Sequence, residues 1–154
     1  MMRKATELIA QAERQCQDRH VKLTTKRKLV LKALLSSDRA LSAYELVSLC
    51  KVEFDQIIPA MSVYRILDFL VGQNLAHKLD LANKYVACGH IDCHVEHELS
   101  QFLICSVCQK VSEVTLNERT REGLIDQVQD AGFTLIDPQL EISCVCNECG
   151  EKGE

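Results

Sequence analysis

The stretch "SVYRILDFLVGQNLAHKLDLANKYVAC" (residues 62–88) decides the fold. In its first half the apolar residues recur at helical spacing and form the buried face of a predicted helix: Val63, Ile66, Leu67, Leu70 and Val71. Its second half alternates around the polar turn "LANK" (81–84), which predicts a two-stranded hairpin. Helices followed by such a hairpin, or wing, are typical of a winged helix-turn-helix.

The outer face of this helix carries polar side chains close to its start. The residues that point away from the buried face are Ser62, Tyr64, Arg65 and Asp68. The first residues of a recognition helix reach base edges in the major groove of DNA, and an adjacent Tyr64 and Arg65 suit that position. The other interpretation is a solvated arginine beside a half-packed tyrosine.

Three more helices are predicted before this one. The segment "TELIAQAERQC" (6–16) has apolar residues at helical spacing, and Thr24 precedes the helical pattern "KRKLVLKALL" (26–35). Ser42, with Glu45 three residues later, forms a capping box that opens the third helix. The hairpin therefore follows a helical core.

The pattern changes after residue 99. "SQFLIC" (100–105) and "VSEVTL" (111–116) predict strands, Asn117 caps a helix that ends before Gly132, and "FTLIDPQLEISC" (133–144) alternates again. We predict a small α/β domain here, and an α+β class for the whole chain. The expected limits are 1–83 for the winged-helix domain, 84–96 for a hinge and metal-binding loop, and 97–154 for the α/β domain.

The formal net charge of -4 is unevenly distributed. Residues 1–83 carry 13 Lys and Arg against 9 Asp and Glu, a net +4, whereas residues 84–154 carry 5 against 13, a net -8. The first half is therefore the candidate for binding a polyanion, although a mildly basic face is also common on a solvated surface.

The chain shows neither the apolar run of a signal peptide at its start nor a stretch long enough for a membrane span. We therefore expect a cytoplasmic protein without a membrane partner. Disulfides do not persist in that reducing compartment, so the nine cysteines indicate metal ligation or redox chemistry.

Two Cys-x-x-Cys pairs predict a structural zinc site. Each pair places two sulfurs on one tight turn, and two such turns supply the four thiolates of a closed tetrahedral site. The four predicted ligands are Cys105, Cys108, Cys146 and Cys149. A thioredoxin-like redox motif is disfavoured because neither pair is expected to open a helix after a strand.

A second group of metal-binding residue types precedes these pairs. It comprises Cys88, His90, Cys93, His94 and His97. With His77 in the hairpin and Glu113 in the strand after Cys108, these residues allow a mixed sulfur, nitrogen and oxygen site, which suits zinc better than magnesium, calcium or manganese. The alternative for each histidine is a solvated loop position.

A catalytic zinc site has one partial match. "HVE" (94–96) followed by a Cys-x-x-Cys pair is similar to the motif of zinc nucleobase deaminases. However, Ile104 stands where that motif has proline, and the pair lies between predicted strands. We therefore expect neither an enzyme nor a small organic substrate.

The chain resembles the ferric uptake regulator family, and most of all its zinc-sensing members. The segments that carry the resemblance are "RHVKLTTKR", "SAYEL", "SVYRILDFL", "LAHKLD", "SQFLICSVCQKVSE" and "CNEC", which span nearly the whole chain in family order. The resemblance implies a homodimeric, DNA-binding metalloregulator. Its parts would be an N-terminal winged helix, a C-terminal dimerisation domain, a structural zinc and a regulatory metal near the hinge.

The resemblance also implies contacts with DNA. Tyr44 and Arg65 match base-contacting positions, with Tyr64 beside them. The residues that match backbone-contacting positions are Lys22, Lys26 and Arg27. The family's usual Thr-Pro-x-Arg lacks its proline here, which we expect to matter little because Thr24 can still cap the helix.

The regulatory zinc ligands implied by the resemblance are His77, Cys88, Glu113 and a histidine shortly before "SQFLIC". The family position for that histidine falls on Glu98, whereas His97 lies one residue earlier, and we favour His97. The remaining residues form a rim that could bind a further zinc weakly: His90, Cys93 and His94.

Together these observations predict a zinc-responsive repressor of zinc uptake genes. We expect it to hold two zinc ions per chain, one structural and one regulatory, and to bind a palindromic double-stranded operator as a homodimer. The alternatives are an iron- or peroxide-sensing regulator of the same family, a zinc hydrolase or deaminase, and a structural zinc adaptor that ignores DNA.

Overall fold

The computed structural model describes residues 2–91, 99–136 and 139–152, and it divides into two compact units, Met1–His94 and Val95–Glu154. The first unit combines helices with a hairpin and the second combines a sheet with helices, so the predicted α+β class is confirmed. The predicted domain limits, with a hinge over 84–96, stay a prediction. Among the described residues, no helix is both long and apolar enough to cross a membrane.

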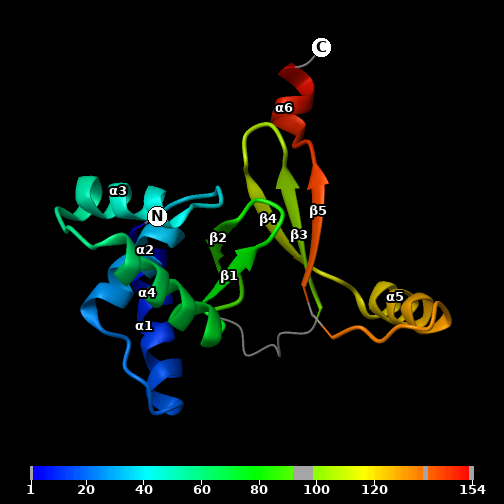
Figure 1. The fold of residues 1–154 in the computed structure, drawn as a ribbon, viewed down its shortest axis with the longest axis horizontal. Coiled ribbons are helices and arrows are strands. Elements are labelled where there is room, and N and C mark those ends of the chain that lie inside the picture. Colours follow the sequence, from blue (N-terminus) through cyan, green and yellow to red (C-terminus); the bar gives the residue numbers. More distant parts are fainter. Residues whose placement is uncertain (1, 92–98, 137–138, 153–154) are drawn as a thin grey trace. The chain divides into compact units, whose positions relative to one another are not determined.

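Figure 1 labels the elements. Those of the first unit are α1 (Met2–Asp18), α2 (Thr25–Leu35), α3 (Ala43–Phe54), α4 (Ala60–Gly72), β1 (Ala76–Leu79) and β2 (Lys84–Ala87). Those of the second unit are β3 (Ser100–Cys105), β4 (Val111–Thr115), α5 (Glu118–Asp130), β5 (Gln139–Cys144) and α6 (Asn147–Lys152).

A hydrophobic core joins all four helices of the first unit to its hairpin. The buried face of α4 contains four of the five residues that the periodicity predicted: Val63, Ile66, Leu67 and Leu70. The fifth, Val71, is only half-buried and packs against the same core. Cys16 and Cys50 are buried in the same core, and burial raises the pKa of both thiols. These two cysteines therefore act as small apolar residues.

Side-chain caps fix where the helices begin. Thr24 accepts a hydrogen bond from the backbone N–H of Arg27 at the start of α2. At the start of α3 the predicted capping box is present, because Ser42 and Glu45 each accept a backbone N–H of the other. Such caps satisfy N–H groups that the first turn of a helix leaves without a partner. Both helix starts therefore follow from local sequence.

The wing is the predicted hairpin, with β1 antiparallel to β2. It is held to the segment before α3 by two backbone hydrogen bonds between Leu41 and Tyr85, of 2.8 and 2.9 Å. An ion pair lies beside them, with 2.9 Å between Lys84 Nζ and Glu45 Oε1. The wing is thus fastened to the start of α3 by both backbone and side chains.

The second unit contains a three-stranded sheet in the order β4-β3-β5. Strand β3 pairs antiparallel with β4 and parallel with β5, and α5 makes the connection between these outer strands. Asn117 caps α5, as predicted, by accepting the backbone N–H of Thr120. The parallel pairing places Cys105 opposite Cys144 at the end of the sheet where both strands finish.

One prediction about this unit is wrong. The pair Cys146-x-x-Cys149 does open a helix after a strand, since β5 ends at Cys144 and α6 begins at Asn147. The physical reason is that the Cys-x-x-Cys turn is itself a helical turn: the carbonyl of Cys146 accepts the N–H groups of Cys149 and Gly150. Helix placement alone therefore does not argue against a redox motif here.

Candidate functional site

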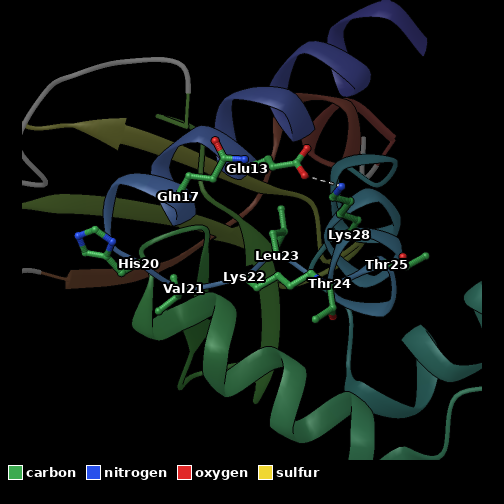
Figure 2. A pocket seen from close by; sticks show the side chains of 9 residues that line it. All are labelled: Glu13, Gln17, His20, Val21, Lys22, Leu23, Thr24, Thr25 and Lys28. Atoms are coloured by element: carbon green, nitrogen blue, oxygen red, sulfur yellow. Dashed lines mark hydrogen bonds and ion pairs between the residues drawn. The ribbon is translucent and has the colours of Figure 1, made fainter.

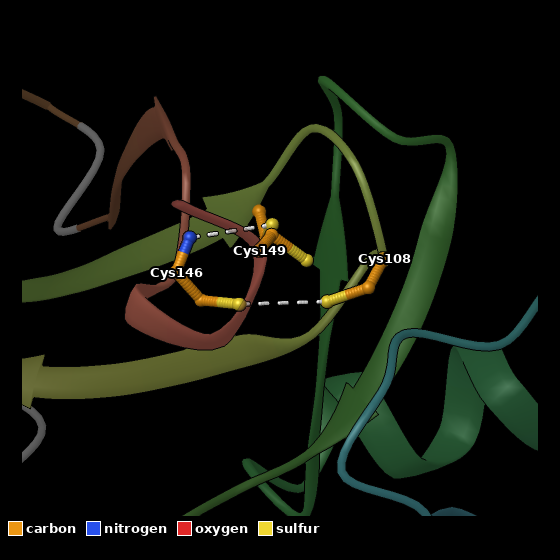
Figure 3. A group of neighbouring side chains, drawn as sticks. Cys108, Cys146 and Cys149 are labelled. Atoms are coloured by element: carbon orange, nitrogen blue, oxygen red, sulfur yellow. Dashed lines mark hydrogen bonds between the residues drawn. The ribbon is translucent and has the colours of Figure 1, made fainter. Parts of the chain in front are cut away.

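The four cysteines of the two Cys-x-x-Cys pairs form one cluster at the end of the second unit's sheet. The Sγ atoms of Cys105, Cys108, Cys146 and Cys149 lie within 4.8 Å of one another. Figure 3 shows Cys146, directly before α6, and Cys149, within α6, facing Cys108 from the turn after β3. The two turns therefore bring their sulfurs to one point, and all four cysteines are free thiols. Each turn supplies two of the four ligands that one metal ion needs.

The distances suit a tetrahedral zinc ion. Four sulfurs placed at about 2.3 Å from zinc in a tetrahedron stand about 3.8 Å apart. The Sγ atoms of Cys108 and Cys146 are 3.8 Å apart. The donor set and the spacing therefore both fit a closed four-thiolate site.

Two thiols of the cluster, Cys105 and Cys149, differ in acidity. Hydrogen bonds from backbone N–H groups, first that of Cys108 and then that of Cys146, lower the pKa of Cys105 to about 6. A side-chain hydrogen bond with Cys146, together with desolvation, raises the pKa of Cys149 to about 12. The cluster alone therefore does not ionise fully at neutral pH. A divalent cation held by the four sulfurs would supply the positive charge that favours their thiolate forms.

A fifth cysteine lies next to this cluster without belonging to it. Cys144 is the register partner of Cys105 across β3 and β5, but its Sγ points to the carbonyl of Ile142 at 3.6 Å. Cys144 is therefore a matched control for the cluster. It is a cysteine at the same end of the sheet, but its sulfur does not point toward the other four.

A second pair of ligand types lies on the wing of the first unit. A ring nitrogen of His77, on β1, and the Sγ of Cys88, directly after β2, are within 4.8 Å of each other. The backbone N–H of Cys88 donates to the carbonyl of Leu75, and the N–H of His90 lies 3.4 Å from the Cys88 sulfur. Backbone groups on both sides therefore hold the thiol beside the imidazole.

The other predicted metal ligands are distributed as follows. Glu113 is half-buried on β4 of the second unit, and His90 is half-buried just after Cys88. The remaining ones lie outside the described residues: Cys93, His94, His97 and Glu98. The choice between His97 and Glu98 stays a prediction.

The predicted base-contacting residues stand together on one surface of the first unit. The rings of Tyr44, on α3, and Tyr64, on α4, pack edge to face with centroids 6.4 Å apart. Both rings are also open to solvent, with exposed fractions of 67% and 39%, and Arg65 is exposed beside them. The sequence predicted each residue separately, whereas the contact between the two tyrosines comes from the packing of α3 on α4.

The predicted backbone-contacting residues lie at the start of α2. Lys22 and Lys26 are exposed, and Lys22 lines a hollow with the cap residue Thr24 (Figure 2). Arg27 is more engaged: its guanidinium stacks 3.7 Å from the centroid of Phe69 on α4 and donates to the carbonyl of Lys22 at 2.7 Å. Arg27 therefore holds the approach to α2 against α4.

The sequence did not predict the ion pair between Lys84 and Glu45. These residues are 39 positions apart, and a lysine in a polar turn is common by itself. Two features of the sequence could have indicated this ion pair: Glu45 is a capping-box glutamate, and Lys84 is a basic residue in the turn of the predicted hairpin.

Comparison with known proteins agrees with these features. The family model described as the ferric uptake regulator family matches residues 18–143. The zinc uptake regulation protein of Escherichia coli (strain K12) is 37% identical over 149 residues, which cover 94% of this chain and 82% of that protein.

Solved structures give the same result. A zinc uptake regulator complexed with zinc and DNA has a TM-score of 0.81 and 34% identity, with 97% of each chain covered. The crystal structure of holo XcZur has a TM-score of 0.76 and 29% identity, covering 94% of this chain and 98% of that one. The chain therefore belongs to the ferric uptake regulator family of metal-responsive, DNA-binding transcription regulators, and it is not an enzyme.

Proposed function

We propose that this regulator is a zinc-responsive repressor of zinc uptake genes that binds palindromic operators as a zinc-loaded homodimer. The observation that carries the proposal is the His77–Cys88 pair on the wing of the DNA-binding unit. An imidazole and a thiolate together suit zinc better than hard, oxygen-preferring cations. The names of the relatives above, which are zinc uptake regulators, support the same choice.

The regulatory site requires more ligands than this pair. On the family resemblance we propose Glu113 and His97 as the others, with Glu98 as the alternate to His97. His90, Cys93 and His94 would form the rim able to hold a further zinc weakly. When bound, zinc would supply a positive charge and a fixed bond geometry to ligands that come from both units.

The second zinc of each chain would be held by the four-cysteine cluster. Its role would be structural, because four protein thiolates leave no open coordination position. Binding energy at such a site is also folding energy, so the second unit would depend on the metal for its stability. The stoichiometry we propose is two zinc ions per chain.

Contacts with operator DNA would come from the first unit. We propose that Tyr44, Tyr64 and Arg65 contact bases, since they share one solvent-facing surface beside the start of α4. The exposed Lys22 and Lys26 would contact phosphates, and Arg27 would hold that segment in place. A regulator that contacts DNA in this way would act in the cytoplasm.

Exposed apolar side chains on the second unit support the homodimer. Those with exposed fractions above 40% include Val114, Phe133, Ile136 and Ile142. Helix α5 has no fully buried residue, although Leu124, Ile125 and Val128 lie on it half-buried. Apolar surface of this extent on a folded unit indicates contact with another protein surface, and a second copy is the partner that the family resemblance implies.

Repression would depend on geometry. In a homodimer the spacing of two recognition helices decides whether both enter successive major grooves of a palindrome. Zinc ligation would stabilise the spacing that fits. A coupling of about 1–3 kcal/mol, the usual range for allosteric proteins, corresponds to a change of roughly 5- to 150-fold in DNA affinity.

The test is a DNA-binding titration at fixed free zinc and then at fixed free iron, with bound metal counted per chain. We expect zinc-dependent binding with two zinc ions per chain, and loss of the zinc response in His77→Ala and Cys88→Ser. One permanent zinc with iron-dependent binding would instead identify an iron sensor. A fully zinc-responsive His77→Ala variant would contradict the proposed site.

A further inference from the structure

The start of α4 exposes a large apolar side chain that neither metal site uses. Met61, in the first turn of the helix, has an exposed fraction of 66%. Ile57, in the connection from α3, and Tyr44, on α3, are similarly exposed at 79% and 67%. The surface that carries Tyr64 and Arg65 is therefore apolar at its N-terminal end.

The rotation of α4 about its axis fixes where Met61 points. Val63, Leu67 and Leu70 are fully buried, so this stripe of the helix faces the core. In a helix, residues three and four positions apart lie on one face, which puts Met61 on the same outer face as Tyr64 and Arg65.

The connection before α4 fixes where the helix begins. Ile58 is buried, with an exposed fraction of 1%, and Pro59 is the N-cap, whose carbonyl accepts the N–H of Val63. The backbone on both sides of Met61 is thus anchored, while its side chain remains in solvent. Met61 is presented in one direction by a rigid support.

The chemistry of Met61 limits what it can recognise. Its side chain is unbranched, apolar and adaptable, and it carries no hydrogen-bond donor. In the major groove three kinds of base edge present mainly polar atoms, whereas thymine presents its C5-methyl group. The N-terminal residues of a recognition helix are the ones that reach these edges.

We propose that Met61 is a specificity-determining residue that contacts the C5-methyl group of a thymine in each operator half-site. The inference rests on the proposed function, since it requires an operator. Tyr64 and Arg65 would read their bases one turn further along the same helix face, so Met61 would add a thymine preference at the adjacent position.

The test uses deoxyuridine, which lacks only the methyl group. A duplex would first be selected from a randomised pool by the zinc-loaded full-length protein. Each thymine would then be replaced by deoxyuridine at both symmetric positions. For one thymine pair, this replacement should weaken wild-type binding by about 15-fold, since burial of one methyl group changes affinity about fourfold in each of the two half-sites. The same replacement should leave the affinity of Met61→Ala almost unchanged.

Two controls separate this contact from a general effect. Met61→Leu keeps an apolar side chain and should retain the penalty for deoxyuridine. Val52→Ala changes another exposed apolar residue, on α3 with an exposed fraction of 78%, and should behave like the wild type. Equal penalties for wild type and Met61→Ala at every thymine would overturn this inference alone. Failure of the zinc-loaded protein to enrich any duplex would overturn the proposed function as well.

Discussion

Lys84 in the wing and Glu45 at the start of α3 form an ion pair, with 2.9 Å between Nζ and Oε1. The other oxygen of the same carboxylate accepts the backbone N–H of Ser42 and so closes the capping box. Glu45 therefore both starts α3 and fastens the wing to it. Since Tyr44 precedes Glu45 and His77 lies on the wing, this residue connects the proposed DNA-contacting surface with a proposed metal ligand.

The Glu45–Lys84 pair predicts a stability difference that depends on pH. The hydrogen bond with Lys84 holds the pKa of Glu45 below its ordinary value of 4.5 in the folded protein. The charge therefore stabilises the fold at any pH above about 4.5, and this contribution disappears as the pH falls through the lower, folded pKa.

Glu45→Gln isolates this contribution, because glutamine still supports a capping box. We expect its free energy of unfolding to fall by less than about 1 kcal/mol at pH 7, since the pair is partly exposed. Urea unfolding at pH 7, 5 and 3.5 measures the difference, which should be smallest at the lowest pH. Lys84→Gln should show the same trend, and a difference independent of pH would contradict the assignment.

Arg27 and Lys26 are neighbours that should behave differently. Arg27→Ala loses the stacking on Phe69 and the hydrogen bond to the carbonyl of Lys22, so we expect unfolding to become easier by about 1–2 kcal/mol. Lys26→Ala removes only an exposed charge and should leave stability unchanged within about 0.5 kcal/mol.

Lys26→Ala should change the salt dependence of DNA binding. If Lys26 neutralises a phosphate, Lys26→Ala should lower the slope of log affinity against log salt by about 1 in each half-site. Thermal melts and DNA titrations at several salt concentrations measure both properties. An Arg27→Ala variant as stable as the wild type would show that the guanidinium does not support the fold.

Gln15 supports the segment that carries Cys88. Its side-chain amide, on α1, donates to the carbonyl of Ile91 at 2.8 Å, and Ile91 is buried three residues after the thiol. We expect Gln15→Ala to weaken zinc binding at the regulatory site by up to about fivefold, since one hydrogen bond contributes about 1 kcal/mol. Competition against a zinc chelator, with the four-cysteine site kept loaded, measures this change. Gln17→Ala, an exposed substitution on the same helix, should have no effect.

Local features of the fold were predictable from the sequence. Thr24, Ser42 and Asn117 cap helices as predicted, because each acts on backbone groups within three residues of itself. The buried face of α4 follows from its period. The four-cysteine cluster was predictable for a different reason. Each Cys-x-x-Cys turn supplies two zinc ligands, and a tetrahedral structural site requires four, so two such turns in one chain indicate a shared site.

Contacts between distant segments were not predictable. Three contacts depend on how the helices and the hairpin pack, and the spacing of residues along the sequence does not indicate them. They are the Lys84–Glu45 ion pair, the edge-to-face packing of Tyr44 on Tyr64, and the hydrogen bond from Gln15 to Ile91. Helix α6 was also missed, because six residues are too few to show a helical period and its first turn is built on the carbonyl of Cys146.

The four-cysteine cluster and its neighbour Cys144 allow a matched test of metal-dependent stability. Cys146→Ser removes a sulfur that lies 3.8 Å from the Sγ of Cys108, whereas Cys144→Ser removes one that points away from the cluster. We expect Cys146→Ser to lose one zinc per chain and to expose the backbone amides of β3 and β5 to hydrogen exchange. Cys144→Ser should keep the metal and the protection.

The same site should respond to pH. Zinc must displace the protons of thiols such as Cys149, whose pKa is raised to about 12, so zinc binding releases protons and its apparent affinity rises with pH. Cys105 differs, because its pKa of about 6 leaves it mostly ionised above that pH. Chelator competition between pH 6 and 8 should therefore show tighter binding at the higher pH in both wild type and Cys144→Ser. A zinc affinity independent of pH would mean that the thiols are not the ligands, because a protonated thiol must release its proton to bind zinc.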